Sequence, residues 1–126
     1  MEHALEVFVG SERVWMSDSR WLYPLFELES VLPTLGHPPA ELEVRDRVVG
    51  RASALVLVYL AVGSVEAEIM SSGGRDVLLL HQVPHRHGEL VPRIGCRTED
   101  LLAQETDPAR AWQILRQRAG LASGER

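Results

Sequence analysis

The chain has a single cysteine, no lysine and no long run of apolar residues. One cysteine cannot form a disulfide within the chain, which suits a reducing compartment, so we expect a cytoplasmic protein. The longest apolar run, residues 54–62, is far shorter than the roughly 20 residues that a membrane-spanning helix needs. Because the first residues show no basic segment followed by an apolar run, we expect no signal peptide.

All 13 positive charges are arginines, and the formal net charge is −5. An acidic protein lacks the positive field that attracts nucleic acid or an anionic membrane surface, so neither is an expected partner. The missing lysine is consistent with a GC-rich coding bias. Phosphate recognition by arginine is the alternative interpretation, and it requires arginines that cluster in space.

The length of 126 residues and the 45% apolar content are typical of one globular domain with a hydrophobic core. We expect this domain to span residues 1–119 and residues 120–126 to form a flexible tail.

The apolar pattern of the first half predicts a β-hairpin, a helix and a strand. The hairpin pairs residues 5–9 with residues 14–17. The helix begins near Pro24 and closes before Gly36, with Pro33 as a point where it ends early or kinks. The strand covers residues 42–49 and is interrupted near Asp46.

The second half alternates helices and strands. Helices are expected at residues 51–60, after residues 71–74, as a turn from 96 to 102, and from Asp107 onwards; strands are expected at residues 65–70 and 85–91. The helix over residues 51–60 is apolar on nearly every side, so it should lie against a sheet and be covered on its other side.

This order predicts an α/β fold with three layers, α/β/α, in which helices lie on both faces of a mixed sheet that begins with the hairpin.

The turn at Gly50 is the best candidate for a ligand site. Because Gly50 leads directly into a helix, backbone N–H groups and the helix dipole point at whatever lies before it, and they favour an anion by about 0.3–1 kcal/mol. Gly50 permits close approach, Arg51 offers a bidentate contact to phosphate or carboxylate, and Asp46 is an acceptor for a hydroxyl or amino group. The alternative is that Gly50 serves a tight turn, Asp46 caps the helix and Arg51 is solvated.

Three stretches of the chain resemble a known family. They are Ser17–Arg20 followed by Pro24–Leu28, the central run Asp46–Ala54, and Leu90–Pro92 followed by Gly95, Cys96 and Glu99. Together they are similar to domain-of-unknown-function family 1893, an uncharacterised prokaryotic family of the cytidine-deaminase-like fold that lacks the zinc-deaminase motifs. The resemblance covers about residues 5–118. Trp21 stands where the family pattern suggests glycine, and Arg97 where it suggests proline.

The resemblance implies a cytidine-deaminase-like fold but not zinc-dependent deamination. That chemistry needs His-x-Glu at the start of one helix and Pro-Cys-x-x-Cys at the start of another. Here the first helix starts Gly50-Arg51-Ala52, and the second site offers Cys96 alone. We therefore expect no metal and no cofactor. The resemblance also places Ser17 and Arg20 near the same pocket, where a helix cap and a surface charge are the alternatives.

Cys96 and three histidines are further candidates. Cys96 lies just before a helical turn between Arg93 and Arg97, a setting that lowers the pKa of a thiol, whereas the acidic residues after it act in the opposite direction. It is interpreted either as a reactive thiol or as a semi-buried small residue. The spacing of His81, His85 and His87 fits a metal site, and it fits solvated loop histidines as well.

Three functions from different classes remain open. The favoured one is binding of a small anionic or nucleotide-like ligand by Asp46, Gly50, Arg51, Ser17, Arg20 and Cys96. The second is an enzyme of unknown reaction that uses Cys96 as a nucleophile. The third is an interaction protein with a degenerate site that forms a homodimer.

Overall fold

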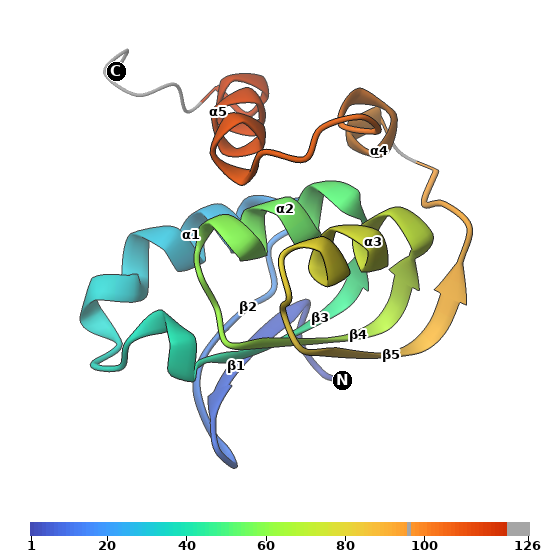
Figure 1. Cartoon of the computed structure of the whole chain (residues 1–126). Helices are drawn as coiled ribbons and strands as arrows, with labels where there is room; N and C mark the ends of the chain where they lie inside the picture. Colours follow the sequence, from blue (N-terminus) through green and yellow to red (C-terminus); the bar gives the residue numbers. More distant parts are fainter. Residues whose placement is uncertain (96, 121–126) are drawn as a thin grey trace.

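A computed structural model describes residues 1–95 and 97–120 of the chain. Its five strands form one mixed sheet in the order β2-β1-β3-β4-β5 (Figure 1). β1 is antiparallel to both of its neighbours, and β3, β4 and β5 are parallel. The strands are β1 (Leu5–Val9), β2 (Glu12–Ser17), β3 (Glu43–Val49), β4 (Ser64–Ser71) and β5 (His85–Val91). The predicted α/β class and the N-terminal hairpin are thereby confirmed.

The helices alternate with the strands after the hairpin. They are α1 (Tyr23–Val31), α2 (Arg51–Tyr59), α3 (Ser72–Leu80), α4 (Arg97–Leu101) and α5 (Pro108–Arg118), with short 3-10 turns η1 (Leu32–Thr34) and η2 (Pro39–Glu41). Within the part of the chain that the structure describes, no helix is long and apolar enough to cross a membrane.

Two expected boundaries differ from the structure. The helix expected to run to Gly36 ends as an α-helix at Val31, because Pro33 cannot donate a backbone hydrogen bond and the chain tightens into η1. The strand expected to break near Asp46 is continuous. β3 pairs with β4 on both sides of that residue, through Arg45 and Val48.

The layers also differ from the expected arrangement. Figure 1 shows α1, α2 and α3 over one face of the sheet, with α4 and α5 beyond them. The layers therefore run sheet, inner helices, outer helices, whereas helices on both faces were expected. α2 occupies the middle, where Ala52–Leu57 are buried and Tyr59 stacks on Trp112 of α5 at 5.0 Å. This position explains why α2 is apolar on nearly every side.

The opposite face of the sheet is polar. Alternate residues of a strand point to opposite faces, and charged side chains recur at every second position in residues 43–47 of β3 and 66–68 of β4. The Nε atom of Arg45 lies 3.2 Å from the Glu43 carboxylate, and Arg86 lies 2.9 Å from that of Glu66. The guanidinium of Arg45 also lies over the Phe8 ring at 4.0 Å. These charged side chains make the face polar, so it is stable in contact with water and needs no covering helix.

The starts of α2 and α3 are packed together at a glycine. A Cβ atom built on Gly74 would lie 2.9 Å from the carbonyl oxygens of both Val49 and Gly50. Those oxygens belong to backbone at the end of β3, which cannot move aside without displacing the start of α2. Gly74 therefore sets how closely the two helix starts approach each other.

We predict that Gly74→Ala lowers the free energy of unfolding by about 1–3 kcal/mol, because the added methyl group forces the two helix starts apart. Urea denaturation of the purified variant measures the change. Gly95→Ala is the matched control, since a Cβ atom at Gly95 meets nothing within 4 Å. Equal stabilities of the two variants would contradict the packing argument.

Candidate functional site

The starts of α2 and α3 share one carboxylate. The backbone N–H of Arg51 donates to the Oε2 and Oε1 atoms of Glu99, at 3.1 and 3.3 Å. The Ser71 hydroxyl donates to Oε2 of the same carboxylate at 3.3 Å, and it accepts from the N–H of Gly74 at 3.0 Å. Glu99 is buried. The anion expected at the start of α2 is therefore supplied by the chain itself.

Two glycines make room for this carboxylate. A Cβ atom on Gly50 would lie 2.3 Å from Oε1 of Glu99, and one on Gly73 would lie 3.0 Å from Oε2. Neither α2 nor α3 has an acidic residue in its own first turn, so Glu99 supplies a carboxylate near both positive helix ends, directly at α2 and through the Ser71 hydroxyl at α3. The close approach expected at Gly50 is present, but the group that approaches is a side chain of the protein.

Arg51 points away from the site it was expected to serve. Its Nε atom donates to the carbonyl of Leu102 at 2.7 Å, and Nη2 donates to the carbonyl of Glu105 at 2.5 Å. These carbonyls follow α4, and that of Leu102 also accepts from the N–H of Glu105 at 3.0 Å. Arg51 thus fastens the segment between α4 and α5 to α2.

A cavity of about 410 Å³ lies in front of the Gly50 turn, at the carboxyl end of β3. Its wall combines the end of β3, the start of α2, the residues between β2 and α1, and the segment that leads into α4. Binding sites of α/β sheets form at this end of the strands. The residues that bear on its chemistry are Arg20, Trp21, Asp46, Gly50, Ser53 and Glu99.

Asp46 lines this cavity, and the pKa of its carboxyl group is shifted. Its side chain is half-buried, and burial raises its pKa to about 7, although the backbone N–H groups of Val48 and Arg47 act against the rise. At neutral pH the carboxyl is therefore divided between its protonated and ionised forms. It can donate or accept a hydrogen bond from a bound molecule.

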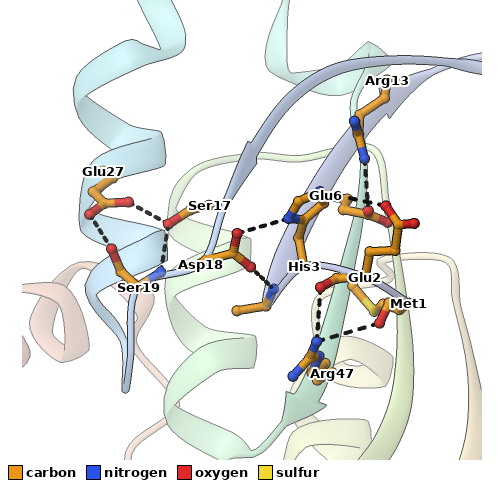
Figure 2. A network of polar contacts seen from close by, with 11 residues as sticks. Met1, Glu2, His3, Glu6, Arg13, Ser17, Asp18, Ser19, Glu27 and Arg47 are labelled. Carbon is orange, nitrogen blue, oxygen red and sulfur yellow. Dashed lines mark hydrogen bonds and ion pairs between the residues drawn. The ribbon is translucent and has the colours of Figure 1, made fainter.

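Polar contacts fix the wall of the cavity on the side of the hairpin (Figure 2). The hydroxyls of Ser17 and Ser19 donate to the Glu27 carboxylate at 2.5 and 2.6 Å. Ser17 therefore holds the segment after β2, and it does not line the cavity.

The N-terminal residues are tied to the same wall. The His3 ring lies 2.8 Å from Asp18, and this hydrogen bond lowers the pKa of the Asp18 carboxyl. Asp18 also accepts from the N–H of Ala4, which lines the cavity. Arg47 donates to the carbonyls of Met1 and Glu2 (Figure 2).

Arg20 is exposed at the cavity. Among residues 1–95 and 97–120, its guanidinium has no hydrogen bond or ion pair. Arg47 lines the same cavity, but its guanidinium is engaged with backbone carbonyls. Arg20 is therefore the cation that remains available to an anionic group at this site.

The remaining candidates do not join this site in the described structure. Cys96 lies outside the described residues. The rings of His81, His85 and His87 contact the backbone carbonyls of Thr106, Val83 and Gly88. Within residues 1–95 and 97–120, no three His, Cys, Asp or Glu side chains are grouped closely enough to share a metal ion.

Sequence analysis missed Glu99 and Trp21 as site residues. The signal for Glu99 was indirect, because both helices that follow β3 and β4 begin without an acidic residue of their own. Trp21 was noted as unusual but was given no role. Ser53 has no signal at all in the sequence, because its place in the cavity depends on the rotation of α2.

These features define a mixed α/β protein with a cavity of ligand size at the end of a central strand. The chain belongs to the family described as "Domain of unknown function (DUF1893)", whose model matches residues 2–118. A crystal structure of a DUF1893 family protein, TM1506 from Thermotoga maritima, has a TM-score of 0.80 at 20% identity. That match covers 91% of this chain and 80% of the other, and it shows the fold alone. No curated protein matches the chain.

We predict that Glu99→Ala lowers the free energy of unfolding by about 1–3 kcal/mol, because two helix starts lose their anion and the N–H of Arg51 loses its acceptor. Urea denaturation measures the change, and Glu99→Gln, which keeps the shape without the charge, should fall between this variant and the wild type. Removal of the exposed Glu89 by Glu89→Ala is the control, with an expected change below about 0.5 kcal/mol. A Glu99→Ala variant as stable as this control would show that the carboxylate is dispensable.

We predict that Asp46→Asn is more stable than the wild type above pH 7 and that this advantage disappears near pH 4. The folded protein holds the Asp46 proton more tightly than the unfolded chain, so wild-type stability falls as the pH rises through this window. The difference should grow by at most about 1.4 kcal/mol per pH unit. Thermal denaturation between pH 4 and 8 measures it, with the exposed Asp76→Asn as control. A stability difference that does not change with pH would contradict the raised pKa.

Proposed function

We propose that the protein binds a small anionic, nucleotide-like ligand in the cavity at the end of β3. The observation that carries this proposal is the distribution of charge around the cavity. A hydrogen-bonding carboxyl group, Asp46, reaches the cavity from the middle of β3, and an uncommitted cation, Arg20, is exposed between β2 and α1. A ligand with hydrogen-bond donors at one end and an anionic group at the other matches both groups.

The proposed position of the anionic group differs from the one expected from sequence. Because Glu99 occupies the start of α2 and Arg51 is engaged with carbonyls, neither group of that turn is available to the ligand's anion. The anionic group is therefore assigned to Arg20. A guanidinium binds phosphate or carboxylate through two parallel hydrogen bonds, which gives orientation as well as attraction.

The proposal does not include zinc-dependent deamination. The residues at the starts of α2 and α3 are Gly50-Arg51 and Ser72-Gly73, which offer none of the His and Cys ligands that a deaminase uses, and the second segment expected from the sequence offers Cys96 alone. The carboxylate of Glu99 lies between these two helix starts. A cytidine-deaminase-like fold, a single domain over residues 1–119 and a cytoplasmic location stay predictions.

The two other functions stay predictions as well. The role of Cys96 as a nucleophile concerns a residue outside the described structure. A homodimer with a degenerate site has no specific observation in its favour, whereas the cavity favours binding of a small molecule.

We predict that at least one ribonucleoside 5′-monophosphate raises the melting temperature of the wild-type protein by several degrees at saturating concentration, since a ligand that binds only the folded state stabilises it. Arg20→Ala should weaken this binding roughly 10-fold or more, because a charge-assisted hydrogen bond is lost. Thermal shift and isothermal titration calorimetry measure the two effects.

Arg110→Ala is the matched control, because Arg110 is exposed on α5 and does not line the cavity. It should bind the nucleotide as the wild type does. Equal binding by the Arg20 and Arg110 variants, or no response to any nucleotide at millimolar concentration, would refute the proposed function.

A further inference from the structure

Trp21 has a backbone conformation that tryptophan rarely adopts. Among the described residues, three that are not glycine have a positive φ: Trp21 at 56°, Ala61 at 64° and Gln82 at 60°. Ala61 and Gln82 directly follow the C-cap residues of α2 and α3, Leu60 and His81, where a left-handed residue commonly ends a helix. Trp21 precedes a helix, so helix termination does not account for its conformation.

Trp21 occupies a turn position at which glycine is normally found. The N–H of Tyr23 donates to the carbonyl of Arg20 at 3.1 Å, which closes a four-residue turn. Trp21 has a positive φ, and Leu22 follows with φ −97° and ψ 3°. These are the φ signs of a type II′ turn, whose second residue is usually glycine. A tryptophan here costs free energy that a glycine would not, and strain of this kind is concentrated at functional sites.

The surroundings of Trp21 do not offset this cost by burial in the core. The residue is 44% exposed and lines the cavity. Its ring contacts Tyr23 and Phe26 edge-on, with centroids 5.4 and 6.0 Å apart. Phe26 in turn packs against Trp112 of α5 at 5.3 Å. The ring is thus braced by an aromatic cluster anchored in the core, while much of its surface remains exposed.

The neighbours of Trp21 in the cavity are polar groups suited to a heterocycle. Arg20, the available cation, directly precedes it in the chain, and Asp46 lines the same cavity. Asp46 can accept a hydrogen bond from a ring N–H or an amino group. A sugar phosphate without a base would engage Arg20 but leave the tryptophan without a partner.

We propose that Trp21 is a stacking residue and that the ligand carries a flat nitrogen heterocycle, with a donor directed at Asp46 and a phosphate directed at Arg20. The ligand class is therefore a nucleotide. This inference rests on the proposed function and deepens it, because it assigns Trp21 as the residue that recognises the base of the nucleotide-like ligand. Tryptophan is the side chain that gives the largest π-face for such stacking.

The test compares ligands with and without a base. Isothermal titration calorimetry with the four ribonucleoside 5′-monophosphates and with ribose 5-phosphate should show at least one nucleotide binding wild-type protein roughly 10-fold more tightly than ribose 5-phosphate. Trp21→Gly and Trp21→Ala should remove this difference without changing ribose 5-phosphate binding. Trp21→Phe should retain most of it.

The Gly and Ala variants also separate a binding role from a structural one. Both lack the ring, but only glycine adopts a positive φ without strain. Trp21→Gly should therefore melt at a higher temperature than Trp21→Ala, although both bind the nucleotide equally weakly. A lower melting temperature for Trp21→Gly would overturn the premise of a strained site.

The remaining outcomes distinguish the two proposals. If ribose 5-phosphate and the nucleotides bind equally well and Trp21→Gly changes neither affinity, stacking is refuted and binding of a small anion stands. If no compound binds to the wild-type protein, the proposed function and the stacking inference fail together.

Discussion

The Glu99 carboxylate between two helix starts is the interaction on which the site depends. A helix start concentrates partial positive charge, and two of them side by side repel each other unless an anion lies between them. Here a residue 48 positions from Arg51 in the chain supplies that anion, and it accepts from the Arg51 N–H and from the Ser71 hydroxyl. Gly50 and Gly73 leave the space that this carboxylate occupies. Because Glu99 belongs to α4, the same contact also joins α4 to the inner helices. Loss of this carboxylate would therefore affect both the charge at the site and the packing of the outer helices.

This constraint changes what the cavity in front of Gly50 can bind. A free helix start would attract an anion, but a neutralised one does not. The wall near β3 and α2 therefore presents acceptors, Asp46 and Glu99, whereas the cation that remains available, among the described residues, is Arg20. The ligand of the proposed function would consequently direct its donors inward toward the strand and its negative charge toward the segment between β2 and α1. Binding of the ligand's anionic group at the helix start, which the sequence suggested, is disfavoured by this arrangement.

The sequence predicted the elements well because their signals are local. Apolar periodicity defined the hairpin and the helices, and the residues around Gly50 and Asp46 do line a cavity. Arg51 could not be placed in this way, because its direction is decided by the carbonyls of Leu102 and Glu105, which a distant segment brings alongside α2. The layer order, by contrast, was available from the sequence. Charged residues recur at positions 43, 45 and 47 of β3 and at 66 and 68 of β4, which is typical of a sheet with one face in water.

Trp21 has a strained backbone conformation, and it also lines the cavity. A glycine would satisfy the turn between β2 and α1, and tryptophan satisfies it less well. Its ring is nevertheless held in place by Tyr23 and Phe26, so its position is fixed before any ligand arrives. A rigid aromatic side chain loses little conformational entropy when a ligand binds, which favours affinity for a flat ring that stacks on it. The turn that strains the backbone also includes Arg20, so the same four residues place the backbone of the aromatic residue and of the cation side by side.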